Sequence, residues 1–235
     1  MKYCVAARRR RRVMVENEDK AFTTHYSFRK SYDTVERFIS YFYQISLIRE
    51  LAVTEILEIG IGNKTVSNYL KQCGLAVTTC DYDEDLKPDV VADIRQLPME
   101  ENSFDVVLAC EILEHLPWED VPAALDQLHR VTRRYAVVSV PYSCISLNVI
   151  FGSQVITRLF KTPCWGLFLG IPMFLRGCKF KGHGRHYWEM GRRGYSTKKV
   201  KKALREKFNI IKVVRPVLSS NLNHRFFVLE VKDDH

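Results

Sequence analysis

The sequence lacks the features of a membrane-spanning or secreted protein. No segment reaches the roughly 20 consecutive apolar residues that a spanning helix requires. The seven cysteines include no C-x-x-C pair, which indicates thiols used as small apolar side chains in a reducing compartment. The arginine run at 8–12 is not followed by the apolar core of a secretory signal. We therefore expect a cytoplasmic protein in which residues 1–20 are a disordered basic tail; an organelle transit peptide and a true start at Met14 are the alternatives for this segment.

The length and the charge of the chain indicate how many domains it forms and which partners it would bind. The 235 residues carry a formal charge of +9, and this length suffices for one domain with a full hydrophobic core, expected at 21–235. Lys and Arg are concentrated in the N-terminal run and at 192–202. This distribution favours a tail and a solvated helix face over a nucleic-acid surface. Nucleic acid is therefore the less favoured partner.

The segment 54–93 has the pattern of strands that meet at a glycine turn. An apolar run at 54–59 stops at Gly60 and Gly62, which have no Cβ and let a ligand approach the backbone. A helical pattern follows, with Asn63 as its expected N-cap. The start of such a helix presents free N–H groups to a carboxylate of a ligand.

Two more strands in this segment end in acids. Strand 76–80 leads into Asp81 and Tyr82, and an acid at this place in a doubly wound sheet accepts hydrogen bonds from ribose hydroxyls. Strand 89–92 leads into Asp93 and Ile94, where the carboxylate would bind the adenine amine and the isoleucine would pack on the ring. The sequence therefore predicts a nucleoside pocket at one edge of a parallel sheet.

The rest of the chain completes an α/β fold. The runs 208–217 and 225–231 are too close for a crossover helix, so they should pair antiparallel. We predict a doubly wound, mostly parallel, seven-stranded sheet that ends in this antiparallel hairpin. The other expected strands lie at 103–110 and 135–140, and helices are expected at 33–51, 119–131 and after Ser196. Asp33 and Glu36 would form a capping box at the start of the helix 33–51.

These motifs resemble the class I S-adenosylmethionine-dependent methyltransferases, especially the ubiquinone and menaquinone type. The likeness covers roughly residues 50–141, and it is carried by Glu58-Ile-Gly60-Ile-Gly62, Asp81, Asp93 with Leu97-Pro98, and Phe104 to Leu116. Lys64 replaces the family's third glycine. A dinucleotide-binding turn would instead need glycine at Thr65, which disfavours a dehydrogenase. The resemblance implies S-adenosylmethionine as cofactor, bound by Glu58, Gly60, Gly62, Asn63, Asp81, Tyr82, Asp93, Ile94, Cys110 and Glu111.

The end of the fourth strand offers a metal site as an alternative. If Glu111, Glu114 and His115 shared a helical turn, they would lie on one side and could hold Mg²⁺ or Mn²⁺. The resemblance adds that some small-RNA 2′-O-methyltransferases and ubiquinone-pathway O-methyltransferases use such a set for metal. Many relatives carry these residues with no metal known, and we favour a site without one.

Two segments outside the common core would select the acceptor. In the insertion 142–182, residues 164–175 are continuously apolar between Lys161 and Arg176. They should form a lid over an apolar pocket or a peripheral contact with a membrane, and a subdomain that packs only on its own protein is an equal alternative.

The loop 183–189 after this insertion concentrates histidine, arginine, acid and aromatic residues. We nominate His186 as the base, then His183, with His115 as a third choice. The predicted function is O-methylation of a small or lipid-linked acceptor. The alternatives are an RNA 2′-O-methyltransferase and a non-catalytic cofactor-binding partner subunit.

Overall fold

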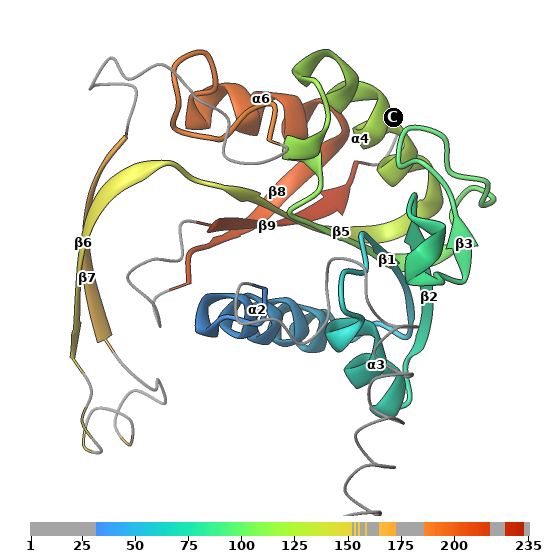
Figure 1. Ribbon diagram of the computed structural model, residues 1–235, viewed down its shortest axis with the longest axis horizontal. Helices are drawn as coiled ribbons and strands as arrows, with labels where there is room; N and C mark the ends of the chain where they lie inside the picture. The colour runs from blue at the N-terminus through green and yellow to red at the C-terminus, as the bar shows by residue number, and fades with distance from the viewer. Residues whose placement is uncertain are drawn as a thin grey trace, which may run out of the picture.

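A computed structural model describes residues 32–151, 165–172, 186–216 and 224–232, with positions 153, 155 and 158. Its centre is a seven-stranded sheet in the order β3-β2-β1-β4-β5-β9-β8 (Figure 1). The strands are β1 (Glu55–Ile59), β2 (Ala76–Asp81), β3 (Val90–Val91), β4 (Phe104–Cys110), β5 (Thr132–Pro141), β8 (Phe208–Val214) and β9 (His224–Val231). This is the predicted α/β class with a mostly parallel sheet.

The C-terminal hairpin also forms as predicted. β9 pairs antiparallel with both β5 and β8, and Val137 of β5 lies opposite Val228 of β9. The pairs β1–β2, β1–β4 and β4–β5 are parallel. Ile56 and Leu57 of β1 are fully buried, as expected for a strand covered on both faces.

Helices cover both faces of the sheet. One face carries α2 (Val35–Leu51) and α3 (Thr65–Gln72), and the other carries α4 (Val121–Val131) and α6 (Thr197–Lys207) (Figure 1). Two buried apolar clusters fill the layers between the sheet and these helices. The connections within residues 32–151 contain short 3₁₀ helices at η1 (Glu84–Leu86), η2 (Leu113–His115) and η3 (Trp118–Asp120).

Ser196 is the N-cap of α6 as predicted, but the predicted starts of α2 and α3 are wrong by one residue. Thr34, not Asp33, is the N-cap of α2, because its hydroxyl accepts a hydrogen bond from the Arg37 N–H at 3.3 Å. Lys64, not Asn63, occupies the N-cap position of α3, with a left-handed φ of 60°. The Asn63 side chain still accepts a hydrogen bond from the Thr65 N–H at 3.1 Å, so it stabilises the first turn from one position earlier.

Glu111 does not share a helical turn with Glu114 and His115. It lies before η2 in a left-handed conformation, φ 58°, and only Glu114 and His115 are in that 3₁₀ turn. Without a shared helical turn, Glu111 is not placed beside the other two by the spacing of three and four that the sequence suggested.

The insertion after β5 begins as an antiparallel ribbon of β6 (Cys144–Phe151) and β7 (Trp165–Pro172). The ribbon is a sheet of its own, separate from the seven-stranded one. Whether the insertion acts as a lid stays a prediction. Among the residues described, no helix has both the length and the apolar composition to cross a bilayer.

Glu58 in β1 is a buried acid within this core. It is 4% exposed, it hydrogen-bonds with Ser67 of α3, and one of its carboxylate oxygens has no partner. Burial raises the pKa of Glu58 to about 7, although Ser67 and Lys71 oppose the shift. A carboxyl group with a raised pKa in the folded state stabilises the fold while protonated, and this contribution is lost as the pH rises through about 7.

We therefore expect Glu58→Gln to become progressively more stable than the wild type as the pH rises. The difference in free energy of unfolding should change by roughly 3 kcal/mol between about pH 4.5 and about pH 8. Urea unfolding over this range measures it. Glu101→Gln, at an exposed acid, is the matched control. Parallel stability profiles for wild type and Glu58→Gln would contradict the burial argument.

Candidate active site

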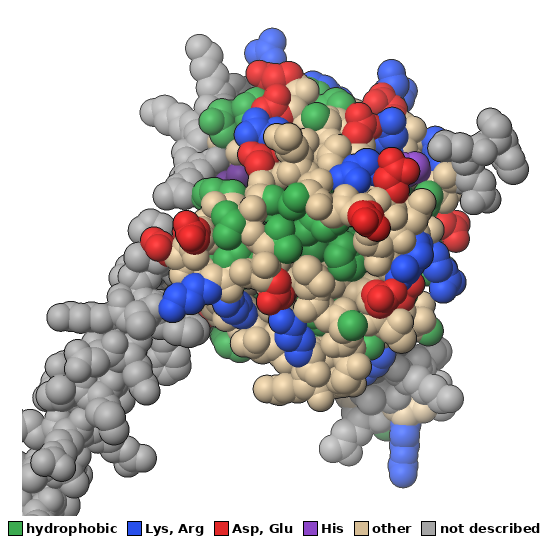
Figure 2. Space-filling view, turned by 90° about the vertical axis from the view of Figure 1, so that its right-hand side faces the viewer, with side chains coloured by type: hydrophobic (Ala, Val, Ile, Leu, Met, Phe, Trp, Pro, Cys, Tyr) green, Lys and Arg blue, Asp and Glu red, His purple; other side chains and the backbone are tan. Residues whose placement is uncertain are grey.

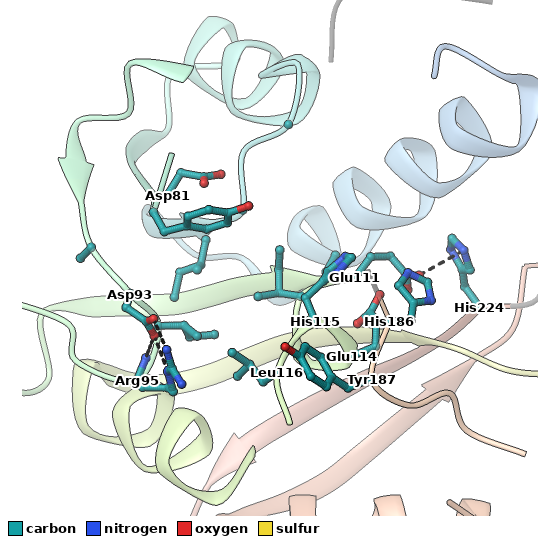
Figure 3. Close-up of a pocket in the computed structure, with 18 of the residues that line it drawn as sticks. Asp81, Asp93, Arg95, Glu111, Glu114, His115, Leu116, His186, Tyr187 and His224 are labelled. Atoms are coloured by element: carbon teal, nitrogen blue, oxygen red, sulfur yellow. Dashed lines mark hydrogen bonds and ion pairs between the residues drawn. The ribbon is translucent and has the colours of Figure 1, made fainter. Parts of the chain in front are cut away.

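A pocket of about 840 Å³ lies at the carboxyl edge of the parallel strands (Figure 3). The turn after β1 and the ends of β2 and β4 contribute to its wall, as they must in an open α/β sheet. Figure 3 shows Asp81 and Asp93 toward one end and a cluster of carboxylates and imidazoles toward the other. One cavity therefore contains both the residues predicted to bind a nucleoside and the residues predicted to carry out catalysis.

The glycine turn is closed to side chains. Gly60 and Gly62 have φ values of 79° and 50°, which favour glycine. A Cβ on Gly62 would lie 2.5 Å from the Tyr32 hydroxyl, and a Cβ on Gly60 would overlap the Ile112 side chain. Lys64 also has a positive φ, so it adopts the backbone conformation that a glycine would take without strain. The turn therefore requires glycine at positions 60 and 62, because Ile112 and Tyr32 occupy the space that a Cβ would take.

Asp81 ties the end of β2 to this turn. Its Oδ2 accepts a hydrogen bond from the Ile61 N–H at 3.0 Å, and its Oδ1 accepts one from the Asp83 N–H at 3.0 Å. The residue is 5% exposed yet lines the pocket, and burial raises its pKa. Each carboxylate oxygen has a second lone pair, so the group can still accept hydrogen bonds from a ligand's hydroxyls.

Asp93 is also in the pocket wall, but Arg95 engages its carboxylate. The guanidinium donates from Nη2 to Oδ2 at 2.6 Å and from Nε to Oδ1 at 2.9 Å. These hydrogen bonds lower the pKa of Asp93. Arg95 also bonds Asp120 at 2.5 Å. An adenine amine would therefore have to share Asp93 with a cation that the sequence did not pair with it.

Of the six other residues predicted to contact the cofactor, four line the pocket and two do not. Tyr82, Ile94, Cys110 and Glu111 line the pocket, whereas Glu58 and Asn63 do not. Glu58 instead bonds Ser67 of α3. Asn63 accepts a hydrogen bond from Tyr41 and donates one to Asp33, each at 3.0 Å, so it connects the starts of α2 and α3. Direct cofactor contact by Glu58 or Asn63 has no support from this geometry.

Glu111 is held in its strained conformation by two partners. Its Oε1 accepts a hydrogen bond from the Ser139 hydroxyl at 2.8 Å, and its Oε2 lies 3.2 Å from Nε2 of His224 (Figure 3). Non-glycine residues with positive φ gather at functional sites because the surrounding structure must support the strain. His224 was missed from the sequence, since it lies at the start of β9, far along the chain from Glu111.

Glu114, His115 and His186 converge beside Glu111. One ligand atom from each lies within 4.8 Å of the others, and the two imidazole rings meet edge to face with centroids 4.9 Å apart. Glu114 is fully buried, and neither carboxylate oxygen has a hydrogen-bond partner. Burial and then the charge of Glu111 raise the pKa of Glu114 well above its usual value. Burial therefore favours the neutral form of this group, and a bound cation would favour the ionised form.

Glu189 holds the His186 ring. Nδ1 of His186 lies 3.2 Å from Oε1 of Glu189, whose Oε2 accepts hydrogen bonds from the Ser143 hydroxyl and from Nε of Arg192. Burial opposes ionisation of Glu189, but the bonds from His186 and Ser143 outweigh it and lower its pKa to about 2. His183, the second nominated base, lies outside the described residues.

This arrangement of carboxylates and imidazoles is compatible with two chemical roles, general base catalysis and metal binding. An imidazole whose Nδ1 is held by a carboxylate can accept a proton at Nε2. One carboxylate and two imidazoles can also bind a divalent cation. Both possibilities place the chemistry at the end of β4, opposite the glycine turn across the same pocket (Figure 3).

Comparisons with known proteins agree with this geometry. Residues 57–140 match the family model described as a methyltransferase domain. No curated protein matches the sequence. Magnesium protoporphyrin IX methyltransferase from Synechocystis PCC 6803, solved with S-adenosylhomocysteine, is similar in structure with a TM-score of 0.56 and 16% identity, over 94% of this chain and 95% of that one.

Two further solved structures are similar over nearly their whole length. The N-methyltransferase NodS from Bradyrhizobium japonicum WM9 has a TM-score of 0.57 and 13% identity, over 93% of this chain and 98% of that one. The 1,6-didemethyltoxoflavin-N1-methyltransferase from Burkholderia thailandensis has a TM-score of 0.53 and 13% identity, over 99% of this chain and 90% of that one. The family match covers residues 57–140, and the solved structures share the order of the sheet, so the comparisons show a methyltransferase domain with the Rossmann-like fold that was predicted.

Proposed function

We propose that this methyltransferase methylates a hydroxyl group of a small or lipid-linked acceptor, with His186 as the base. The observation that carries the proposal is the single pocket that joins the glycine turn and Asp81 to the His186–Glu189 pair. S-adenosylmethionine, when bound, supplies an electrophilic methyl group. The protein then needs to orient the two reactants and remove the hydroxyl proton.

The cofactor would occupy the end of the pocket with the glycine turn. Gly60 and Gly62 line the part of the pocket where the methionine part would lie, and Asp81 would accept hydrogen bonds from the ribose hydroxyls. The exposed ring of Tyr82 and the buried Ile94 would flank the adenine. Asp93 would accept the adenine amine while Arg95 keeps the carboxylate ionised.

His186 would take the acceptor's proton at Nε2. The ionised Glu189 favours the imidazole tautomer with its hydrogen on Nδ1, which leaves Nε2 as the acceptor. A base is needed for a hydroxyl more than for an amine, because a neutral amine can be methylated before it loses its proton. The need for a base therefore favours a hydroxyl over an amine as the methyl acceptor. Two of the structurally similar enzymes are nevertheless named as methyltransferases that act on nitrogen.

The charge on one face gives no support to an RNA acceptor. Figure 2 shows acidic and basic side chains interspersed around an apolar area on this face, and no continuous basic stripe. A phosphate backbone is bound through clustered Lys and Arg side chains. The non-catalytic partner subunit also stays a prediction, and the His186 experiment below addresses it.

Metal-assisted deprotonation is the second candidate. The observation that favours it is the convergence of Glu114, His115 and His186 within 4.8 Å, with the buried Glu114 carboxylate lacking a partner. A cation there would bind the acceptor oxygen and lower the pKa of its hydroxyl. This differs from the predicted set of Glu111, Glu114 and His115, because the Glu111 carboxylate is bound to Ser139 and His224 instead.

Replacing Asp81 with alanine should weaken cofactor binding. Loss of hydrogen bonds to a charged acceptor should raise the Kd for S-adenosylhomocysteine by roughly 10- to 100-fold. Isothermal titration calorimetry measures it, with Asp85→Ala in the neighbouring η1 as the control that should bind like the wild type. Equal affinities for wild type and Asp81→Ala would remove Asp81 from the cofactor site.

Replacing His186 with alanine should abolish most of the turnover and spare cofactor binding. Loss of a general base lowers kcat by roughly 10²- to 10⁴-fold, measured as transfer of labelled methyl to a panel of phenols, catechols and prenylated quinols. The Kd for S-adenosylhomocysteine should stay within about twofold. His129→Ala, on α4 outside the pocket wall, is the control. Normal turnover in His186→Ala would reject the base.

Chelation separates the two candidates. Because His186 accepts the proton without a metal in the first candidate, turnover after dialysis against EDTA should stay within about twofold of the untreated enzyme. Addition of Mg²⁺, Mn²⁺ or Zn²⁺ should change nothing. A loss that Mg²⁺ or Mn²⁺ restores, together with stoichiometric metal by elemental analysis that disappears in Glu114→Gln, would assign the metal-assisted mechanism.

A further inference from the structure

The wall of the pocket contains a cation that the sequence did not predict. Arg37, in the first turn of α2, lines this pocket, and so does Tyr32, which precedes the helix. Arg37 is half-buried. The charged residues predicted for the nucleoside part of the pocket were acids, so an arginine changes which groups of a ligand can bind there.

Arg37 lies near the glycine turn. The central carbon of its guanidinium is 3.9 Å from the centroid of the Tyr32 ring, which is a cation–π contact. The hydroxyl of the same ring would lie 2.5 Å from a Cβ on Gly62. One aromatic ring therefore lies against both the guanidinium and the turn. Arg37 thus belongs to the end of the pocket where the methionine part of the cofactor would lie.

Two hydrogen bonds fix the start of α2 to this turn. Asn63, next to Gly62, donates from its side-chain amide to Oδ1 of Asp33 at 3.0 Å and accepts from the Tyr41 hydroxyl at 3.0 Å. These two partners lie on either side of Arg37 in the sequence, so the backbone that carries Arg37 is held against the turn. A side chain on a fixed backbone loses less conformational freedom when a ligand binds.

The guanidinium of Arg37 is oriented by its own segment of the chain. Its Nε donates a hydrogen bond to the Tyr32 carbonyl oxygen at 3.2 Å. Within the part of the chain that the structure describes, no residue accepts a hydrogen bond from Nη1 or Nη2 of Arg37. These two groups of a guanidinium can form parallel hydrogen bonds to the two oxygens of a carboxylate. Arg37 therefore offers the donors that a carboxylate requires.

Other donors that could bind a carboxylate here are engaged within the protein. The sequence predicted free N–H groups at the start of α3, but the Thr65 N–H donates to the side chain of Asn63 at 3.1 Å. Lys64 does not line the pocket, and its Nζ donates to the Lys87 carbonyl oxygen at 2.7 Å. Arg95, the other arginine in the described wall, is held by two aspartates. These contacts leave Arg37 as the best candidate.

We propose that Arg37 binds the carboxylate of the methionine part of S-adenosylmethionine through Nη1 and Nη2. The inference rests on the cofactor placement proposed above, with the ribose at Asp81. The acids Asp81, Asp93 and Glu111 in the pocket wall suit the ammonium and the sulfonium of the cofactor but repel its carboxylate. A contact with Arg37 would hold the carboxylate at the start of α2 and so fix the direction of the sulfonium methyl.

Calorimetry of the full chain with S-adenosylhomocysteine and with its methyl ester tests the proposal. The ester removes the carboxylate charge and keeps the ammonium. We expect the wild type to bind the acid roughly 10- to 100-fold more tightly than the ester. Arg37→Ala should lose this preference while its affinity for the ester stays within about twofold, and Arg37→Lys should recover part of it. Arg49→Ala, at an exposed position of the same helix, is the matched control.

Three outcomes would overturn the proposal. The wild type could bind the ester as tightly as the acid, a comparison that needs no variant to fold. Arg37→Ala could keep the preference for the acid or lose affinity for both ligands equally. Finally, Lys64→Gln could abolish the preference, which would assign the carboxylate to Lys64. The ester reports on the carboxylate alone, whereas Asp81→Ala should weaken acid and ester alike, so failure of the Arg37 contact is distinguishable from failure of the cofactor placement.

Discussion

The hydrogen bond from the Ile61 N–H to the Asp81 carboxylate organises the site. The register of β1 with β2 pairs Ile59 with Cys80, so the two strands end together and the acid reaches the turn that follows the first strand. Gly60 and Gly62 can then take positive φ values below Tyr32 and Ile112. The Asp81 carboxylate thus fixes the glycine turn at this edge of the sheet, and both line the pocket.

The properties of the rest of the site depend on how burial and hydrogen bonding shift the pKa values of its acids. Burial without compensation raises the pKa of Glu58 and of Glu114, whereas hydrogen bonds from His186 and Ser143 lower that of Glu189 to about 2. Neighbouring carboxylates with opposite shifts can serve different roles at one pH. Glu189 stays ionised and orients an imidazole, whereas burial favours the neutral form of Glu114. The backbone strain at Glu111 belongs to the same cluster.

The sequence predicted the parts of this structure that depend on local patterns. Apolar runs that stop at glycine or at an acid located β1, β2 and β4, and short spacing predicted the β8–β9 hairpin. The pocket wall contains Gly60, Asp81 and His186, as expected. The first residues of α2 and α3 were misplaced because several polar residues compete to cap each helix, and only the folded backbone decides between them.

Contacts between distant segments could not be predicted. His224 beside Glu111, Arg95 bridging Asp93 and Asp120, and the approach of His186 to His115 all join residues from different elements. Residues 165–172 of the apolar run pair with β6 in a ribbon of their own, which the apolar composition of that run did not indicate.

The central claim is that the edge formed by Gly60, Asp81 and Asp93 binds an adenosine that carries a methylated sulfur. Calorimetry of the wild-type chain with S-adenosylmethionine, and separately with NAD, tests it most directly. The account predicts saturable binding of one S-adenosylmethionine per chain and no heat from the dinucleotide. Binding of NAD with no response to S-adenosylmethionine would contradict it.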